Sequence, residues 1–286
     1  MNSSEHISDL GRRVKVSIVA YQTDTDELRA IVGDLHAAGL MQICVVDNSP
    51  DDRLRPFCRD LGVDYVFMGR NVGYGSAHNV AMRLSLDAPS TDYHLVINSD
   101  MRVPAETPRM IADFMDSHPD VGQLIPRIDY PDGGLQPAVR LLPAPIDVIG
   151  RRFLPGRLMK RRNARYTLAF WDHASAADVP YHQGCFMWLR VEALRRVGLF
   201  DERFFMYPED IDLTRRMHRY YRTLYWPEAR VTHYHRAASY RSWKMLRVHV
   251  VNMIRYFNKW GWLFDSERRR VNRQVIERLK NNGGEA

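Results

Sequence analysis

Apolar runs alternate with amphipathic segments along the first 130 residues of the chain. Five apolar runs are predicted to form buried strands, at residues 14–21, 42–47, 63–68, 94–98 and 121–128. Amphipathic segments predict helices at residues 25–38 and 105–117, and a third helix that starts near residue 73. Apolar strands that alternate with helices are typical of a mainly parallel sheet covered on both faces. We therefore expect an α/β fold.

Polar residues directly follow three of these predicted strands. They are Tyr21, Asp47 and the run Asn98-Ser99-Asp100. Ligands of parallel sheets lie beyond the carboxyl ends of the strands, so we expect these side chains along one rim. Asp100 offers the hard oxygen that Mg²⁺ or Mn²⁺ prefers. The alternative for this run is a plain turn, because Asn, Ser and Asp all favour turns.

A glycine-spaced segment opens the third predicted helix. It reads Arg70-Asn71-Val-Gly73-Tyr-Gly-Ser-Ala-His-Asn79. Glycines allow the backbone to approach a nucleotide, and a helix N-terminus favours an anion. An ordinary strand-to-helix turn explains the same spacing.

The pattern loosens after residue 130. The segment Asp132-Gly-Gly-Leu-Gln136 predicts a turn, and the basic segment 150–165 is interpreted as a flexible lid. Strands are predicted at 185–189 and 222–232, the second of which ends in His233-Tyr-His235. Two histidines at a spacing of two lie on the same side of a strand, where one of them can complete a metal shell. Residues 241–264 predict an amphipathic helix rich in Trp, Arg and Lys.

The most informative segment is Phe200–Arg216, in which an aromatic run leads into three carboxylates. Glu209, Asp210 and Asp212 follow Pro208, which favours the first turn of a helix. Carboxylates beside apolar walls often serve as bases in a partly dry cleft. The alternative is an ordinary acidic helix start with an Asp212–Arg216 pair.

Length and composition limit the choices further. The 286 residues fit one α/β domain with a helical appendage. Three scattered cysteines lack metal or redox spacing, and neither a leader nor a membrane-spanning run is evident, so we expect a cytoplasmic protein. The net charge of +7 is concentrated, because residues 240–286 carry eleven Lys and Arg against four acids, and residues 150–170 carry seven against none. An anionic partner at defined places is therefore expected.

Together these motifs resemble glycosyltransferase family 2, and especially its bacterial rhamnosyltransferase-like branch, over about residues 14–264. The resemblance rests on the order and spacing of several segments, which include Ser17-Ile-Val-Ala-Tyr21, Val45-Val-Asp-Asn-Ser49, Asn71-Val-Gly-Tyr-Gly75, Leu95-Val-Ile-Asn-Ser-Asp100, Asp132-Gly-Gly-Leu-Gln136, Gly198–Leu213 and Pro227–His233. It implies the GT-A fold, with a Rossmann-like sheet, flanking helices and a C-terminal helical extension. It also implies a transferase domain at 1–240, whose nucleotide half is about 14–130 and whose acceptor half is about 131–240, and a basic tail at 241–286.

The resemblance assigns roles to the candidate residues. Asp210 is the base that deprotonates the acceptor hydroxyl, and Glu209 and Asp212 organise its surroundings. Asp100 binds the divalent cation, Mg²⁺ or Mn²⁺, with help from His233 or His235. The nucleotide contacts are assigned to Tyr21, Asp47, Arg70, Asn71, Gly73, Asn79, Asn98 and Ser99. The chain departs from the family in two places, since Asn98 stands where a first aspartate is usual and no glycine follows His233.

The function implied is inverting transfer of a sugar, L-rhamnose from dTDP-L-rhamnose, to a hydroxyl of a cell-surface glycan or lipid-linked intermediate. Another nucleotide-sugar, such as a UDP-hexose or UDP-galactofuranose, is an alternative donor. The basic, Trp-rich tail fits an anionic membrane surface or, equally, a helix packed on the main domain. A non-catalytic nucleic-acid-binding protein is a third reading, which the absence of a recognisable nucleic-acid module opposes.

Overall fold

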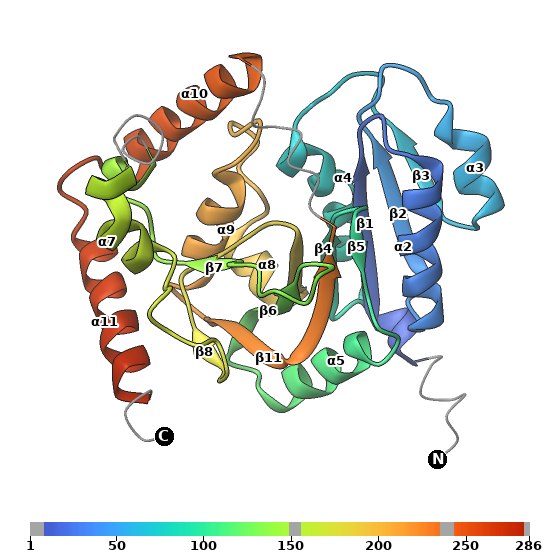
Figure 1. Cartoon of the computed structure of the whole chain (residues 1–286). Helices are drawn as coiled ribbons and strands as arrows, with labels where there is room; N and C mark the ends of the chain where they lie inside the picture. Colours follow the sequence, from blue (N-terminus) through green and yellow to red (C-terminus); the bar gives the residue numbers. More distant parts are fainter. Residues whose placement is uncertain (1–8, 149–155, 235–242, 283–286) are drawn as a thin grey trace.

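A computed structural model describes residues 9–148, 156–234 and 243–282. Its central sheet contains β1 Val14–Ala20, β2 Gln42–Asp47, β3 Asp64–Phe67, β4 Tyr93–Ile97, β5 Met101–Arg102, β6 Val121–Asp129, β8 Ala177–Asp178, β10 Phe186–Arg190 and β11 Arg222–His233. Their order is β3-β2-β1-β4-β10-β6-β11-β5, and β8 pairs with β11 (Figure 1). A separate two-stranded ribbon joins β7 Val139–Arg140 to β9 Tyr181–His182.

The sheet is parallel in its N-terminal part and mixed beyond β4. The strands β3, β2, β1 and β4 all run parallel, as the alternation of strands and helices predicts. β10 then runs antiparallel between β4 and β6, while β11 is parallel to β6. The chain reaches β10 only after a long excursion through the ribbon, so β10 enters the sheet from the opposite direction.

Helices cover both faces of the sheet, as predicted for buried strands. The helices are α2 Thr25–Ala37, α3 Leu54–Asp60, α4 Tyr74–Asp87, α5 Thr107–Ser117, α7 Gly156–Tyr166, α8 Val191–Val197, α9 Glu209–Met217, α10 Trp243–Trp260 and α11 Ser266–Asn282. The apolar sides of α2, α3 and α5 pack in the large core cluster on one face. α4, α8 and α9 cover the other face, where Met82, Leu194 and Leu213 are buried.

The C-terminal helices pack on the main body beside α9 (Figure 1). Tyr256 and Phe257 of α10 and Val275 of α11 belong to the same large core cluster as the sheet. A buried ion pair reinforces this contact, because Arg215 of α9 lies 2.8 Å from Asp265 and both side chains are 3% exposed. The amphipathic helix predicted at 241–264 is therefore α10, packed on the main domain. Its outer side still exposes Val250, Val251 and Ile254.

α11 lies in the segment predicted as a basic amphipathic helical tail, 241–286, but the sequence did not indicate where α10 ends and α11 begins. α10 gives way at Gly261, which has a φ of +99°, a backbone conformation that favours glycine. α11 buries Val271, Val275 and Leu279, which recur every four residues in an otherwise charged segment. None of the described helices combines the length and apolar character needed to cross a membrane.

The basic segment interpreted as a flexible lid is a helix over its described part. α7 buries Met159 and Tyr166, and Arg162 forms an ion pair with Asp147 at 2.5 Å. Residues 149–155 lie outside the described residues.

Candidate active site

The carboxyl ends of β1, β2 and β4 meet at one edge of the sheet, as the parallel pairing requires. This edge carries Tyr21, Asp47 and residues 98–100, as the sequence predicts. Tyr21 is 52% exposed, so its ring is available to a ligand. Asp47 is buried, and its two oxygens accept hydrogen bonds from the Ser49 amide and the Tyr65 hydroxyl, both at 2.8 Å. Each carboxylate oxygen has a second lone pair, so Asp47 can still accept a bond from a ligand.

The glycine-spaced segment places the start of α4 against the loop that precedes α9. Gly73 has a φ of +94°, and a Cβ there would lie 2.4 Å from the Phe205 carbonyl oxygen. The next amide, of Tyr74, donates to the same oxygen at 3.0 Å. Only glycine therefore allows this close approach. Asn71 supports the turn, because its side-chain oxygen accepts from the Gly73 amide at 3.0 Å. Arg70, at the start of the segment, is exposed.

Asn79 lies one turn further along α4 and is buried. Its side-chain nitrogen donates to the Phe200 carbonyl oxygen at 2.9 Å, and its side-chain oxygen accepts from the Phe200 amide at 3.0 Å. The same nitrogen lies 3.0 Å from Glu202. These contacts occupy the amide, so Asn79 holds the 200–202 loop from behind the rim.

Asp100 is held by a histidine from the neighbouring strand. His233 Nε2 lies 3.1 Å from Asp100 Oδ1, and His233 Nδ1 lies 3.0 Å from Gln136 Oε1. Burial alone lowers the pKa of His233. The hydrogen bond to Asp100 and other contacts raise the pKa by more, so that it reaches about 10. A doubly protonated ring fits this geometry, because both ring nitrogens face acceptor oxygens. His233 therefore orients Asp100.

Ser99 and Asn98 are tied to different neighbours. The Ser99 hydroxyl donates to Glu27 of α2. Asn98 Oδ1 accepts from the Tyr74 hydroxyl at 3.0 Å. His235 lies outside the described residues. Across the described ranges, no group of three or more His, Cys, Asp and Glu side chains is arranged to hold a metal ion.

Asp210 lies close to this edge of the sheet. Its Oδ2 accepts from the Gly184 amide at 2.9 Å, and the Gly184 carbonyl oxygen accepts from the Tyr74 hydroxyl at 2.7 Å. The same hydroxyl oxygen lies 3.0 Å from Asn98 Oδ1, and because a hydroxyl carries one proton, the two acceptor oxygens share it. A short chain of polar contacts thus connects Asp210 to the end of β4. The acidic helix and the tip of the fourth predicted strand therefore lie in one site.

The two adjacent carboxyl groups of α9 are strongly perturbed. Burial raises the pKa of Asp210 to about 7, against backbone hydrogen bonds from Gly184 and Ile211 and the charge of Arg140, which lower it. Burial and the neighbouring Asp210 raise the pKa of Glu209 well above its ordinary value. No described residue donates a hydrogen bond to Glu209 Oε2. A carboxyl group with a pKa near neutrality is suited to accept a proton from a weak acid.

Asp212 points away from this pair and joins α9 to α10. It is fully buried and forms an ion pair with Arg216 at 2.8 Å, the i,i+4 alternative considered from the sequence. It also accepts from Lys259 at 2.6 Å and from the Trp260 indole at 2.8 Å. Asp212 therefore supports the helix that carries Asp210, from the side opposite the rim.

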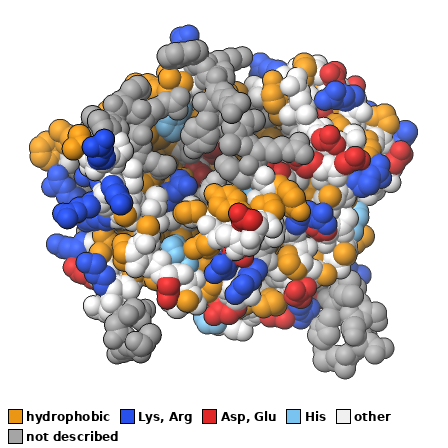
Figure 2. All heavy atoms as spheres, viewed as in Figure 1, with side chains coloured by type: hydrophobic (Ala, Val, Ile, Leu, Met, Phe, Trp, Pro, Cys, Tyr) orange, Lys and Arg blue, Asp and Glu red, His pale blue; other side chains and the backbone are white. Residues whose placement is uncertain are grey.

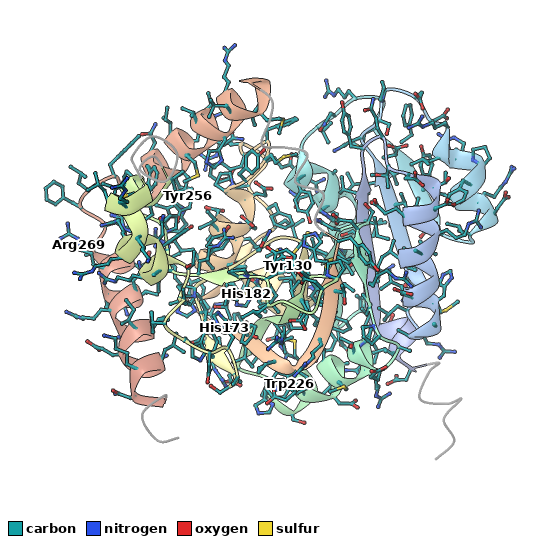
Figure 3. All side chains as sticks on the ribbon, viewed as in Figure 1. Tyr130, His173, His182, Trp226, Tyr256 and Arg269 are labelled. Atoms are coloured by element: carbon teal, nitrogen blue, oxygen red, sulfur yellow. The ribbon has the colours of Figure 1, made fainter. Side chains whose placement is uncertain are left out.

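Sequence reasoning missed three residues at the centre of the site. Tyr74 and Gln136 stood inside motifs that were singled out, between two glycines and at the end of Asp132–Gln136. Gly184 gave no signal, although a Cβ there would lie 3.3 Å from the Asp210 Cβ. His182, two residues before Gly184, and Tyr130, directly after β6, lie near the middle of the molecule (Figure 3).

Comparison with known proteins identifies the family of the chain. A family model described as glycosyl transferase family 2 matches residues 16–198. A low-salt glycan biosynthesis hexosyltransferase, Agl10 of Haloferax volcanii, is 28% identical over 219 residues, which cover 72% of this chain and 62% of the relative. An N-acetylglucosaminyl-diphospho-decaprenol L-rhamnosyltransferase of Mycobacterium tuberculosis is 32% identical over 182 residues, 60% of this chain and 58% of the relative. The chain thus spans about three fifths of the length of these curated relatives.

Solved structures support the fold. The crystal structure of GalNAc-T7 with UDP, GalNAc and Mn²⁺ matches with a TM-score of 0.56, covering 77% of this chain and 43% of that one. The sequence identity is 14%, so this likeness bears on the fold alone. With the family match, it confirms the GT-A fold expected from the sequence.

Proposed function

Because the chain belongs to glycosyltransferase family 2, and is thus a glycosyltransferase, we propose that it moves a sugar from a nucleotide-sugar to an acceptor hydroxyl with Asp210 as base. The observation that carries this proposal is the hydrogen-bonded path from Asp210 through Gly184 and Tyr74 to Asn98. It brings a buried carboxyl group of raised pKa beside the strand ends where the donor would lie.

The chemistry is a single displacement. Asp210 takes the proton of the acceptor hydroxyl while that oxygen forms a bond to the anomeric carbon. The bond from the anomeric carbon to the diphosphate oxygen breaks, its electron pair leaves with the nucleoside diphosphate, and the anomeric centre inverts. Holding both substrates in one cleft supplies the proximity that this displacement needs. A base of raised pKa supplies the proton acceptor.

The donor end is assigned to the rim. Asp47 would accept a hydrogen bond from the pyrimidine base, and Tyr21 would pack on that base. Arg70, Asn71 and the Gly73 backbone would line the nucleotide, in line with the role that helix N-termini and basic residues play toward phosphates.

A divalent cation fits beside Asp100. The Asp100 carboxylate is oriented by His233, which Gln136 holds in turn, and it lies at the edge of the sheet where the diphosphate would leave. With fewer than three protein ligands in the described residues, the donor phosphates would supply the rest of the shell. Such an ion, Mg²⁺ or Mn²⁺, offsets the negative charge that develops on the departing diphosphate.

We further propose dTDP-L-rhamnose as the donor and a lipid-linked glycan as the acceptor, at a membrane surface. The named activity of the Mycobacterium tuberculosis relative supports this choice. A UDP-hexose or UDP-galactofuranose donor is the second candidate, which the hexosyltransferase relative favours.

A panel of nucleotide-sugars with Mn²⁺ tests both levels of the proposal. The cognate donor should raise the melting temperature of the parent, of Asp210→Asn and of a control, Asp60→Asn, whose carboxylate is exposed on α3. Transfer should fall by roughly 10²–10⁴ in Asp210→Asn alone. Sugar transfer by Asp210→Asn at the rate of the parent would show that Asp210 is not the base. A larger rise in melting temperature with a UDP-sugar would show that the proposed donor is wrong.

A further inference from the structure

A hollow lies between α7 and α11. Its volume is about 880 Å³. Arginines line one part of it and apolar side chains another, among them Arg161, Arg165, Arg273, Ile146, Trp262 and Leu263. Lys and Arg side chains gather on this edge of the molecule, beside hydrophobic ones (Figure 2). We call this hollow the arginine cavity.

Three arginines of the cavity are not neutralised by any residue of the described ranges. Arg161 and Arg165 lie one turn apart on α7, and Arg273 faces them from α11. Within the described residues, none of the three forms a hydrogen bond or an ion pair. The one carboxylate of the lining, Asp147, is already paired with Arg162. Guanidinium groups match phosphate oxygens in two-bond geometry, so the cavity is complementary to a phosphate.

The rim of the cavity exposes large apolar side chains. Phe264 is 91% exposed and Leu263 is 66% exposed, in the loop between α10 and α11. Leu158 of α7 is 73% exposed. Arg269, in the first turn of α11, projects outward beside this loop (Figure 3). Exposed apolar tips among cationic side chains are typical of proteins that bind at a membrane surface.

The exposed loop has a rigid base. Asp265, directly after Phe264, forms the buried ion pair with Arg215 of α9. Arg268 donates to the Trp262 carbonyl oxygen at 3.2 Å. The backbone on both sides of Leu263 and Phe264 is therefore fixed, which keeps these side chains directed outward.

The inner wall of the cavity adjoins the acceptor side of the active site. Leu141 and Tyr166 line the cavity, and the Leu141 amide donates to the Tyr166 carbonyl oxygen at 3.1 Å. The residue before Leu141 is Arg140, which lies 3.4 Å from the Tyr181 hydroxyl and whose charge acts on Asp210. The wall of the cavity is thus connected through the backbone to Arg140, whose charge acts on Asp210.

We propose that this surface docks on a bilayer, with Leu263 and Phe264 among the lipids and the arginine cavity around the terminal phosphate of a membrane lipid. The inference rests on the proposed function and deepens it, because docking on a bilayer would bring the active site to the surface where a lipid-linked acceptor lies. A terminal phosphate exposes more oxygens to the three arginines than a phosphate buried within a diester headgroup.

Vesicle binding by the full-length protein tests this surface. The probes are phosphatidylcholine vesicles with either phosphatidic acid or phosphatidylglycerol, matched for surface charge. The parent should bind the phosphatidic acid vesicles more tightly. Arg165→Gln/Arg273→Gln should bind them roughly 25-fold more weakly, since each basic residue at an anionic surface contributes about a factor of five, and should lose the preference. The control Arg12→Gln/Arg59→Gln removes the same charge from exposed positions elsewhere and should bind nearly as the parent does.

Two results would overturn the inference. Equal affinity of the parent for both kinds of vesicle would show that only general charge attraction operates. Equal losses of affinity in the two double variants would show that the arginine cavity is not the binding site.

Phe264→Ser should weaken binding to both kinds of vesicle, and unchanged binding would contradict insertion of the loop. Transfer to a water-soluble acceptor separates this inference from the proposed function. The cavity variant should keep that activity, whereas a parent that prefers phosphatidic acid but transfers no sugar would refute the function alone.

Discussion

Replacing Asp210 by Asn should raise the stability of the protein near neutral pH while it removes activity. The carboxyl group is buried, and burial raises its pKa to about 7. In the unfolded chain the same group has an ordinary pKa near 4. Between these two values the folded state binds a proton that the unfolded state has released, so parental stability falls as the pH rises. Asn is neutral at every pH and similar in shape to the protonated acid.

The size of the stability difference follows from the pH range between the two pKa values. One extra bound proton gives a slope of about 1.4 kcal/mol per pH unit. Between about pH 5 and the pKa of about 7, the parent should therefore lose about 3 kcal/mol relative to Asp210→Asn. For a chain of this length, that corresponds to a difference in melting temperature on the order of 5 °C. Glu209 titrates with Asp210, so the apparent pKa belongs to the pair.

Urea unfolding of parent and variant at a series of pH values measures this difference. The difference between the two free energies should be constant below about pH 4 and should change in favour of the variant toward neutrality. In the parent, kcat/KM should rise with pH through the same range, because the base must be ionised. Identical pH slopes in parent and Asp210→Asn would show that the carboxyl group is ionised throughout, and the proposed raised pKa would then be rejected.

Three further changes test the supports of the site. Asp100→Ala should weaken Mn²⁺-dependent donor binding at least tenfold by calorimetry, whereas exposed Asp87→Ala should not. Gly73→Ala should destabilise the protein by about 3 kcal/mol or more, because its Cβ would meet a carbonyl oxygen at 2.4 Å. Gly133→Ala, also at positive φ but with open space around the Cβ, should cost about 1–2 kcal/mol; similar losses would exclude the close contact. Asp212→Ala should lower the urea midpoint by the equivalent of about 3–5 kcal/mol, and a midpoint within error of the parent would dismiss the α9–α10 anchor.

The sheet was predictable because buried strands can be recognised from the local sequence. β1, β2 and β4 are short, mostly apolar runs, and their burial on both faces follows from that composition. The antiparallel insertion of β10 was not predictable, because its direction depends on a long excursion with few periodic residues. The bounds of α11 could not be read for a related reason, since four apolar residues in a segment of seventeen are a weak signal until a partner surface is known.

The candidate residues on the rim were found because each follows a strand or opens a helix, and both positions are readable locally. Asn79 and Asp212 were also selected, and their supporting contacts became visible only in three dimensions. Asn79 binds the backbone of Phe200, 121 residues away. No local pattern distinguishes such a contact from a ligand contact, because the same amide serves either.

The position of the base illustrates what joins the two halves of the molecule. Tyr74 belongs to the predicted nucleotide half and donates to the backbone of Gly184, 110 residues later, whose amide in turn donates to Asp210. The loop that precedes α9 approaches Gly73 so closely that no side chain would fit at that position. A glycine–tyrosine pair thus fixes the distance between the donor edge and the base, and it does so with the backbone of the second half. The motif is therefore better understood as the junction of the two halves than as a phosphate loop alone.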